Sequence, residues 1–236
     1  MRRHFHSVRL LANGAPRERR GWPVVVYLNH SAWWDPLVCL LLARQFFRQR
    51  DSYGPIDADA LQRYQFFRRL GFFGVANGTV RGAADFLDQA RGILAAENSA
   101  LWLTPQGKFA DGRARPLRFQ SGLGRLARRT RRAAFLPLAI EYTFWEERLP
   151  EVLLSFGEPL FFEAARPLSA PESTQLFESA LASVQDQLAA ASQRRNPEEW
   201  QILLRGHVGT NRVYDLWRRA RAKFHGRAFR AAHSDL

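Results

Sequence analysis

The chain has 236 residues, of which 46% are hydrophobic and 24% are charged. These values suit a globular protein with a sizeable core and exclude a disordered chain. The formal net charge of +13 is carried mainly by arginine and implies an anionic partner, such as nucleic acid, a phospholipid surface or a phosphorylated ligand.

Cys39 is the only cysteine, so no disulfide can form within the chain. The sequence shows neither a secretory signal nor an apolar run of the ~20 residues that a membrane span needs. We therefore expect a cytoplasmic protein with a single domain over residues 1–236. Its core is expected over 21–165, and a helical C-terminal extension over 166–236, with a basic group within 218–230.

Apolar runs typical of β-strands alternate with helical patterns along the chain. Strands are expected at residues 24–28, 72–76, 100–103, 134–142 and 152–156. Helices are expected at 36–50, 79–97 and 121–132, and an amphipathic helix is expected around 177–188. This alternation predicts an α/β fold with a mainly parallel central sheet flanked by helices. Ligands of such sheets bind beyond the carboxyl ends of the strands.

His30 and Asp35 directly follow the first expected strand. A neutral imidazole can accept a proton near pH 7, and a neighbouring carboxylate can fix its tautomer and stabilise the imidazolium. Asp35 followed by Pro36 is also typical of a helix N-cap. Both roles are compatible, because a carboxylate has several acceptor sites. The pair therefore suits a reaction in which a hydroxyl group attacks an acyl carbon.

Four short blocks follow one another in the sequence. They are Asn-His, four residues and Asp at 29–35, a Gly-rich turn and strand at 70–77, an apolar strand running into Pro-Gln-Gly-Lys-Phe at 103–109, and an apolar strand with Pro and Ala at 135–140. In order and spacing they resemble the glycerol-phosphate and lysophosphatidate acyltransferase family, over about residues 22–162. The resemblance implies an acyltransferase-like fold.

The resemblance also implies a reaction. A fatty acyl group would pass from a thioester, either acyl-CoA or acyl carrier protein, to a hydroxyl of a lipid or glycolipid acceptor, with His30 as base and Asp35 as its partner. Neither a covalent intermediate nor a cofactor would be needed, and Ser121 lacks the Gly-x-Ser-x-Gly context of a hydrolase nucleophile. Asn29 or backbone N–H groups near 105–107 would hold the oxyanion.

The second and third blocks depart from the family pattern, in which they hold the acceptor's glycerol-phosphate. Arginine suits that task because its planar fork makes two parallel bonds to phosphate. Here asparagine replaces the arginine of the second block, and Gln-Gly-Lys-Phe replaces Glu-Gly-Thr-Arg in the third. The loss of both arginines puts a glycerol-phosphate acceptor in doubt, although Lys108, Arg113 or Arg115 could still supply a cation for a glycerol-phosphate or lysophospholipid acceptor. The other possibility is an acceptor with a hydroxyl but no phosphate near it, such as a glycolipid, a carotenoid glycoside or another lipid alcohol. The acceptor-binding candidates are Asn77, Arg81, Gln106, Gly107, Lys108 and Arg113.

The acyl chain needs an apolar groove. Trp33, Trp34, Phe72 and Phe73 are the candidates to line it, with ordinary core packing as the alternative. The run Phe-Phe-Arg-Arg at 66–69 suits a bilayer interface. We therefore expect peripheral attachment to the inner face of an anionic membrane.

Other interpretations explain less of the sequence. Nucleic acid binding would account for the charge, but no nucleic-acid-binding signature is present, so no nucleic acid partner is expected. A thioesterase or an inactive lipid-binding relative are the remaining alternatives. His4 and His6 are expected in a disordered or membrane-lying N-terminus, and no metal site is expected, because acidic and cysteine partners at ligand spacing are missing around the terminal histidines.

Overall fold

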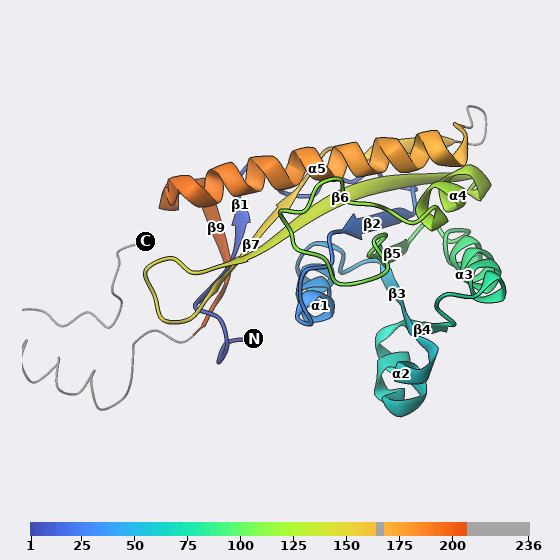
Figure 1. Ribbon diagram of the computed structural model, residues 1–236, viewed down its shortest axis with the longest axis horizontal. Coiled ribbons are helices and arrows are strands. Elements are labelled where there is room, and N and C mark those ends of the chain that lie inside the picture. The colour runs from blue at the N-terminus through green and yellow to red at the C-terminus, as the bar shows by residue number, and fades with distance from the viewer. Residues whose placement is uncertain (164–167, 207–236) are drawn as a thin grey trace, which may run out of the picture. The chain divides into compact units, whose positions relative to one another are not determined.

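A computed structural model describes residues 1–163 and 168–206 (Figure 1). The described residues form two compact units, of which the first comprises residues 1–15, 140–155 and 187–206, and the second comprises 16–139, 156–163 and 168–186. The expectation of one domain stays a prediction. The part of the expected C-terminal extension beyond residue 206, including the basic group at 218–230, lies outside the described residues.

A mainly parallel sheet flanked by helices is present, as the alternation of patterns predicted. The strands of the described chain are β1 (Ser7–Leu11), β2 (Val24–Leu28), β3 (Asp51–Asp57), β4 (Phe72–Val75), β5 (Ser99–Leu103), β6 (Arg132–Thr143), β7 (Glu151–Phe156), β8 (Leu160–Glu163) and β9 (Trp200–Arg205). Their order is β4-β3-β5-β2-β6-β7-β1-β9, and β8 pairs with β6. β9 and β8 run antiparallel to their partners.

The helices of the described chain are α1 (Asp35–Phe46), α2 (Ala58–Arg63), α3 (Val80–Ile93), α4 (Gly122–Arg129) and α5 (Ala170–Arg194), with short 3₁₀ helices η1 (Gln65–Leu70) and η2 (Pro197–Glu199). Thr79 caps α3 as expected, because its hydroxyl accepts a hydrogen bond from the Gly82 N–H at 2.9 Å. None of the helices in residues 1–163 and 168–206 is long and apolar enough to cross a bilayer.

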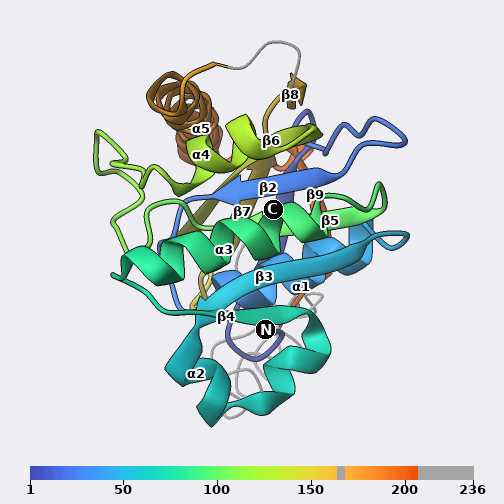
Figure 2. The same ribbon diagram turned by 90° about the vertical axis from the view of Figure 1, so that its right-hand side faces the viewer.

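In the second unit, helices cover both faces of the sheet. The chain crosses from β2 to β3 through α1, and returns from β4 to β5 through α3, so right-handed crossovers place α1 and α3 on opposite faces (Figure 2). β2 lies between β5 and β6 and is buried along its whole length. Its continuous apolar run is typical of a strand that is covered on both faces.

The sequence pattern did not predict β3, because Gly54 and Pro55 interrupt it. The strand tolerates proline because its pairing changes partner along its length: residues 51–53 pair with β5, and residues 54–57 pair with β4. Pro55 therefore lies beyond the part of β3 that pairs with β5.

The expectation of a disordered or membrane-lying N-terminus is wrong. Phe5 and His6 are buried, and only His4 of the two histidines is exposed. β1 follows directly and pairs on both sides, in parallel with β7 and antiparallel with β9. β9 lies in the region where only a helical extension was expected, and Trp200 at its start is buried.

Candidate active site

His30 and Asp35 flank the turn between β2 and α1. His30 follows the last residue of β2 by two positions, and Asp35 is the first residue of α1. His30 Nδ1 lies 2.7 Å from Asp35 Oδ2. The Asp35 side chain is buried, whereas 20% of the His30 side chain is exposed. The fold thus forms the expected pair at the carboxyl end of a central strand and leaves the ring accessible.

The carboxylate of Asp35 is fixed by the turn itself. Asp35 Oδ2 also accepts hydrogen bonds from the N–H groups of Ser31 at 3.0 Å and Ala32 at 3.2 Å. The N-cap of α1 is Trp34, which makes no side-chain cap, so the expectation that Asp35 is the N-cap is wrong by one residue. The side chain binds backward to the turn rather than forward to the helix.

This geometry assigns the tautomer of His30. A carboxylate only accepts hydrogen bonds, so Nδ1 carries the hydrogen that lies between His30 and Asp35. Nε2 then keeps its lone pair and is the basic nitrogen of the neutral ring. The arrangement can remove a proton from a hydroxyl group and hold the resulting imidazolium beside a buried negative charge.

The third block is tied to the backbone of His30. The Gln106 side-chain oxygen accepts a hydrogen bond from the His30 N–H at 2.9 Å, and its amide nitrogen donates to the Leu117 carbonyl at 3.2 Å. The Ala110 N–H donates to the His30 carbonyl at 2.8 Å. Gln106 is buried. The structure therefore brings the first and third blocks together, with Gln106 supporting the turn that carries the imidazole.

Phe109 lies against the imidazole ring. The two ring centroids are 4.2 Å apart with an interplanar angle of 31°, and Phe109 remains 58% exposed. Phe109 was not among the site residues predicted from the sequence. Its position at the end of the third block, where the family carries arginine, was the signal that could have identified it.

Helix α5 holds the loop that carries Phe109. The Glu178 carboxylate accepts hydrogen bonds from the N–H groups of Arg118 at 3.0 Å and Phe119 at 3.1 Å. Gln185 Nε2 donates to the Gly112 carbonyl at 3.0 Å. The amphipathic pattern around residues 177–188 predicted a packing helix here. It did not predict these contacts, because helical periodicity indicates burial and not hydrogen-bond partners.

Three acceptor candidates lie in the same loop, and they differ in their surroundings. Gly107 has a φ of 67°, and its N–H closes a turn onto the Thr104 carbonyl at 3.0 Å. Lys108 is exposed. Arg113 forms a two-point pair with Asp111, with Nη2–Oδ2 at 2.7 Å and Nε–Oδ1 at 3.0 Å, which lowers the pKa of the Asp111 carboxyl well below its usual range. The guanidinium of Arg113 is therefore already paired with a carboxylate of the protein.

The structure removes some of the expected oxyanion donors and singles out none of the others. Proline at 105 has no N–H, and the Gly107 N–H binds Thr104 as described above. Asn29 Nδ2 donates to Ser31 Oγ at 2.7 Å. We therefore assign no oxyanion donor.

The structure does not bring Asn77 and Arg81 to His30. Both follow β4, which is separated from β2 by β3 and β5, so the two strands lie about 14 Å apart at the usual strand spacing. Asn77 Nδ2 donates to Asp57 Oδ2 at 3.2 Å. Arg81 is exposed in the first turn of α3, with Asp85 4.0 Å away. The acceptor candidates thus form two separate groups.

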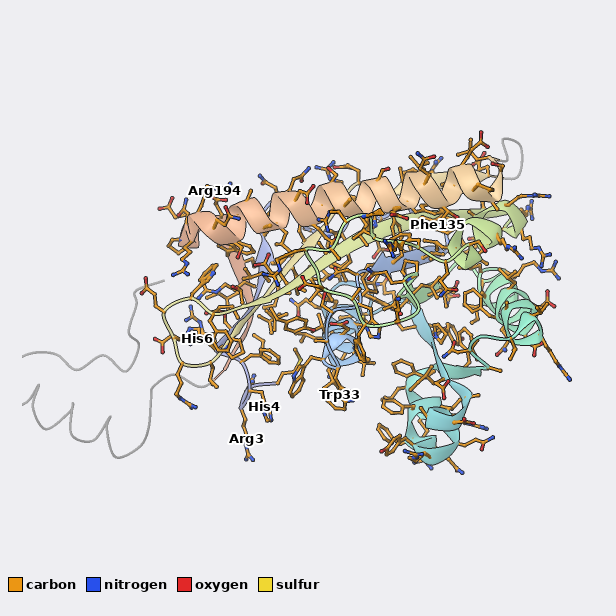
Figure 3. The ribbon with its side chains drawn as sticks, viewed as in Figure 1. Arg3, His4, His6, Trp33, Phe135 and Arg194 are labelled. Atoms are coloured by element: carbon orange, nitrogen blue, oxygen red, sulfur yellow. The ribbon has the colours of Figure 1, made fainter. Side chains whose placement is uncertain are left out.

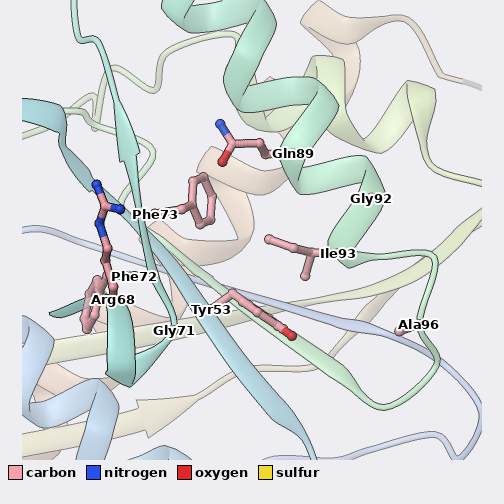
Figure 4. Close-up of a pocket in the computed structure, with 9 residues that line it drawn as sticks. All are labelled: Tyr53, Arg68, Gly71, Phe72, Phe73, Gln89, Gly92, Ile93 and Ala96. Carbon is pink, nitrogen blue, oxygen red and sulfur yellow. The ribbon is translucent and has the colours of Figure 1, made fainter. Parts of the chain in front are cut away.

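The aromatic candidates for the acyl chain are also divided. Trp33 points outward from the turn before α1 (Figure 3), and its ring contacts Trp34 edge-on at 5.5 Å between centroids. Phe72 and Phe73 instead line an open pocket of about 510 Å³ between β4 and α3 (Figure 4). No residue of the first or third block lines this pocket.

A parallel α/β sheet with a His–Asp pair at the end of a central strand defines a site for acid–base catalysis. A family model for acyltransferases matches residues 11–141, which is more than half of the chain and includes all four blocks. The chain therefore belongs to the acyltransferase family, of the glycerol-phosphate and lysophosphatidate type. No curated protein matches it. Membership of this family supports acyltransferase activity in general.

Proposed function

We propose that the protein transfers a fatty acyl group from a thioester, acyl-CoA or acyl carrier protein, to a hydroxyl of a lipid acceptor. The observation that carries this proposal is the 2.7 Å contact between Nδ1 of the partly exposed His30 and the buried carboxylate of Asp35. Membership of the acyltransferase family supports the reaction class. The protein's own residues need no bound cofactor for this chemistry.

His30 acts as the general base in the proposed mechanism. Its Nε2 takes the hydroxyl proton as the acceptor oxygen bonds to the thioester carbonyl carbon. The tetrahedral intermediate then expels the thiolate, which receives the same proton from the imidazolium. Asp35 keeps the ring in one tautomer and stabilises its positive charge. The neutral ring is restored, and no acyl–enzyme bond forms.

The surroundings of His30 favour an acceptor without a phosphate beside the reacting hydroxyl. Phe109 offers an apolar ring face next to the imidazole, and the guanidinium of Arg113 is already paired with Asp111. Lys108 is exposed, but a lysine acts on phosphate as a point charge only. We therefore favour a glycolipid or another lipid alcohol over glycerol phosphate or a lysophospholipid, and we expect the reaction at the inner face of the membrane.

The mechanism is tested with a His30→Ala variant, a radiolabelled acyl donor and a cellular lipid extract as the source of acceptor. Loss of a general base is expected to lower transfer by roughly 10²–10⁴-fold. The exposed His4 provides the matched His→Ala control, which should retain wild-type transfer. Transfer by His30→Ala within about tenfold of wild type contradicts the mechanism.

The same assay separates the alternatives. Free fatty acid released at the same rate without any acceptor would identify a thioesterase, and donor binding without turnover would identify an inactive relative. Mass spectrometry of the acylated product identifies the acceptor. A product acylated on glycerol phosphate would contradict the favoured acceptor class.

A further inference from the structure

Exposed apolar side chains gather on the short connection between β3 and β4. This connection consists of α2 and η1, and it lies at the edge of the sheet (Figures 1 and 2). Phe66 is 56% exposed, and Tyr64 and Leu70 are also exposed. Large apolar side chains that are exposed singly are ordinary, but three within seven residues form a patch that indicates an interaction site.

The exposed rings rest on a packed base. Phe66 stacks on Phe67 with the ring centroids 4.2 Å apart, and Phe67 packs edge-on against Phe72 of β4 at 5.3 Å. The next residue after η1 is Gly71, with a φ of 87°, and a Cβ there would lie 2.0 Å from the Ser52 carbonyl oxygen. Only glycine fits this sharp end. Packing against Phe72 and the turn at Gly71 therefore fix the position of the patch.

Positive charge surrounds the same patch. Residues 58–70 contain three arginines, at 63, 68 and 69, and one acidic residue, Asp59. All three arginines are exposed, and none of them pairs with a carboxylate within the part of the chain that the structure describes. Apolar side chains flanked by free guanidinium groups match the boundary between acyl chains and anionic headgroups.

We propose that the α2–η1 surface, formed by Arg63, Tyr64, Phe66, Arg68, Arg69 and Leu70, docks the protein onto an anionic phospholipid bilayer. Phe66 and Leu70 enter the headgroup–acyl boundary, and the arginines contact lipid phosphates. A nucleic acid would satisfy the arginines but would leave the aliphatic Leu70 without an apolar partner. A bilayer satisfies both kinds of side chain. The inference does not depend on the identity of the acyl acceptor.

Flotation with vesicles of phosphatidylglycerol and phosphatidylcholine tests the proposal. Wild-type protein should float with these vesicles at low salt and dissociate as salt shortens the screening length from ~8 Å at 0.15 M to ~3 Å at 1 M. The double variants R68Q/R69Q and F66S/L70S should each weaken vesicle binding by roughly tenfold or more. No binding of wild-type protein at low salt, or equal binding by all variants, overturns the proposal.

A matched control separates this surface from the general positive charge. Arg128 and Arg129 form another exposed arginine pair, at the end of α4. R128Q/R129Q removes the same charge and should retain most of the binding. If it weakens binding as much as R68Q/R69Q does, the net charge and not this surface attracts the bilayer, and the proposal fails. Circular dichroism verifies that each variant is folded.

Insertion of the α2–η1 surface into the bilayer is measured separately, by fluorescence. An environment-sensitive fluorophore on a F66C variant should shift its emission to the blue with anionic vesicles, while the same label on a Q193C variant on α5 should not. Both variants are made in a Cys39→Ala background, because Cys39 is only half-buried and would compete for the label. An unchanged emission from the label at position 66 contradicts insertion.

Discussion

Asp35 holds three hydrogen-bond donors on one buried oxygen: His30 Nδ1 and the N–H groups of Ser31 and Ala32. The two backbone bonds fix the carboxylate within the turn, and the third fixes the imidazole. Burial strengthens the attraction between this carboxylate and a protonated ring, since fewer water molecules screen it. A single side chain thus links the shape of the turn to the orientation of the His30 ring.

An Asp35→Asn variant separates the role of this side chain in the turn from its role in stabilising the imidazolium. The asparagine oxygen can still accept the backbone hydrogen bonds, but it carries no charge to stabilise the imidazolium. We expect the rate of acyl transfer to fall by roughly 10²–10⁴-fold while the protein remains folded. Initial rates with a thioester donor and circular dichroism measure the two effects. A variant that transfers at the wild-type rate would show that the charge of Asp35 has no catalytic role.

At the scale of elements, the loop after β5 connects His30 to α5. Gln106 and Ala110 bind the backbone of His30 at one end of the loop, and Glu178 binds the N–H groups of Arg118 and Phe119 at the other. Phe109 lies within the first attachment, between Gln106 and Ala110, and contacts the imidazole. Helix α5, which contributes no residue to the His–Asp pair, therefore holds the far end of the loop that carries Phe109.

We predict that Glu178→Ala loosens this loop. Two backbone N–H groups lose their acceptor, which costs about 1–3 kcal/mol of stability. Amide hydrogen exchange should become faster across residues 105–120 but not across β2. The turnover number should fall with little change in the apparent affinity for the thioester donor. Gln193→Ala, an exposed change on the same helix, is the control and should leave both the exchange and the turnover number unchanged.

The elements that periodicity predicted have a clear apolar run or an amphipathic pattern of their own. β2 and β5 are buried along their whole length, and their sequences are apolar apart from Ser99 at the start of β5. β1 and β9 were missed because β1 contains a buried arginine and β9 alternates less clearly. Such strands are stabilised by pairing with neighbours that lie far away in the sequence, and a local pattern does not reveal those neighbours.

At the scale of the whole molecule, each unit has its own stabilising contacts. In the first unit, Arg9 on β1 and Glu151 on β7 are both buried, and Arg9 Nε lies 3.3 Å from the Glu151 carboxylate. Ser7 Oγ also donates to this carboxylate, and the guanidinium of Arg9 lies 4.8 Å from the centre of the Trp145 ring. Neither charge is exposed to water, so each depends on its neighbours.

Glu151→Gln should therefore destabilise the fold strongly. The change removes a buried negative charge next to the guanidinium of Arg9, and breaking a buried ion pair costs about 3–5 kcal/mol. Glu158, whose pair with Arg17 is exposed, provides the control, and Glu158→Gln should cost at most about 1 kcal/mol. Urea denaturation measures both values. Similar midpoints for the two variants would show that the buried pair adds no stability.

The sequence alone determined the alternating α/β architecture and the His30–Asp35 pair. Both are local properties, because a strand or helix shows its burial in its own periodicity, and a five-residue turn brings its two ends together. Only the tertiary structure decided that Gln106, 76 residues from His30, supports the turn, and that Glu178, 59 residues from Phe119, anchors the loop. It also separated Asn77 and Arg81 from the imidazole. These relations depend on which strands become neighbours in the sheet, and that order is set by packing over the whole chain.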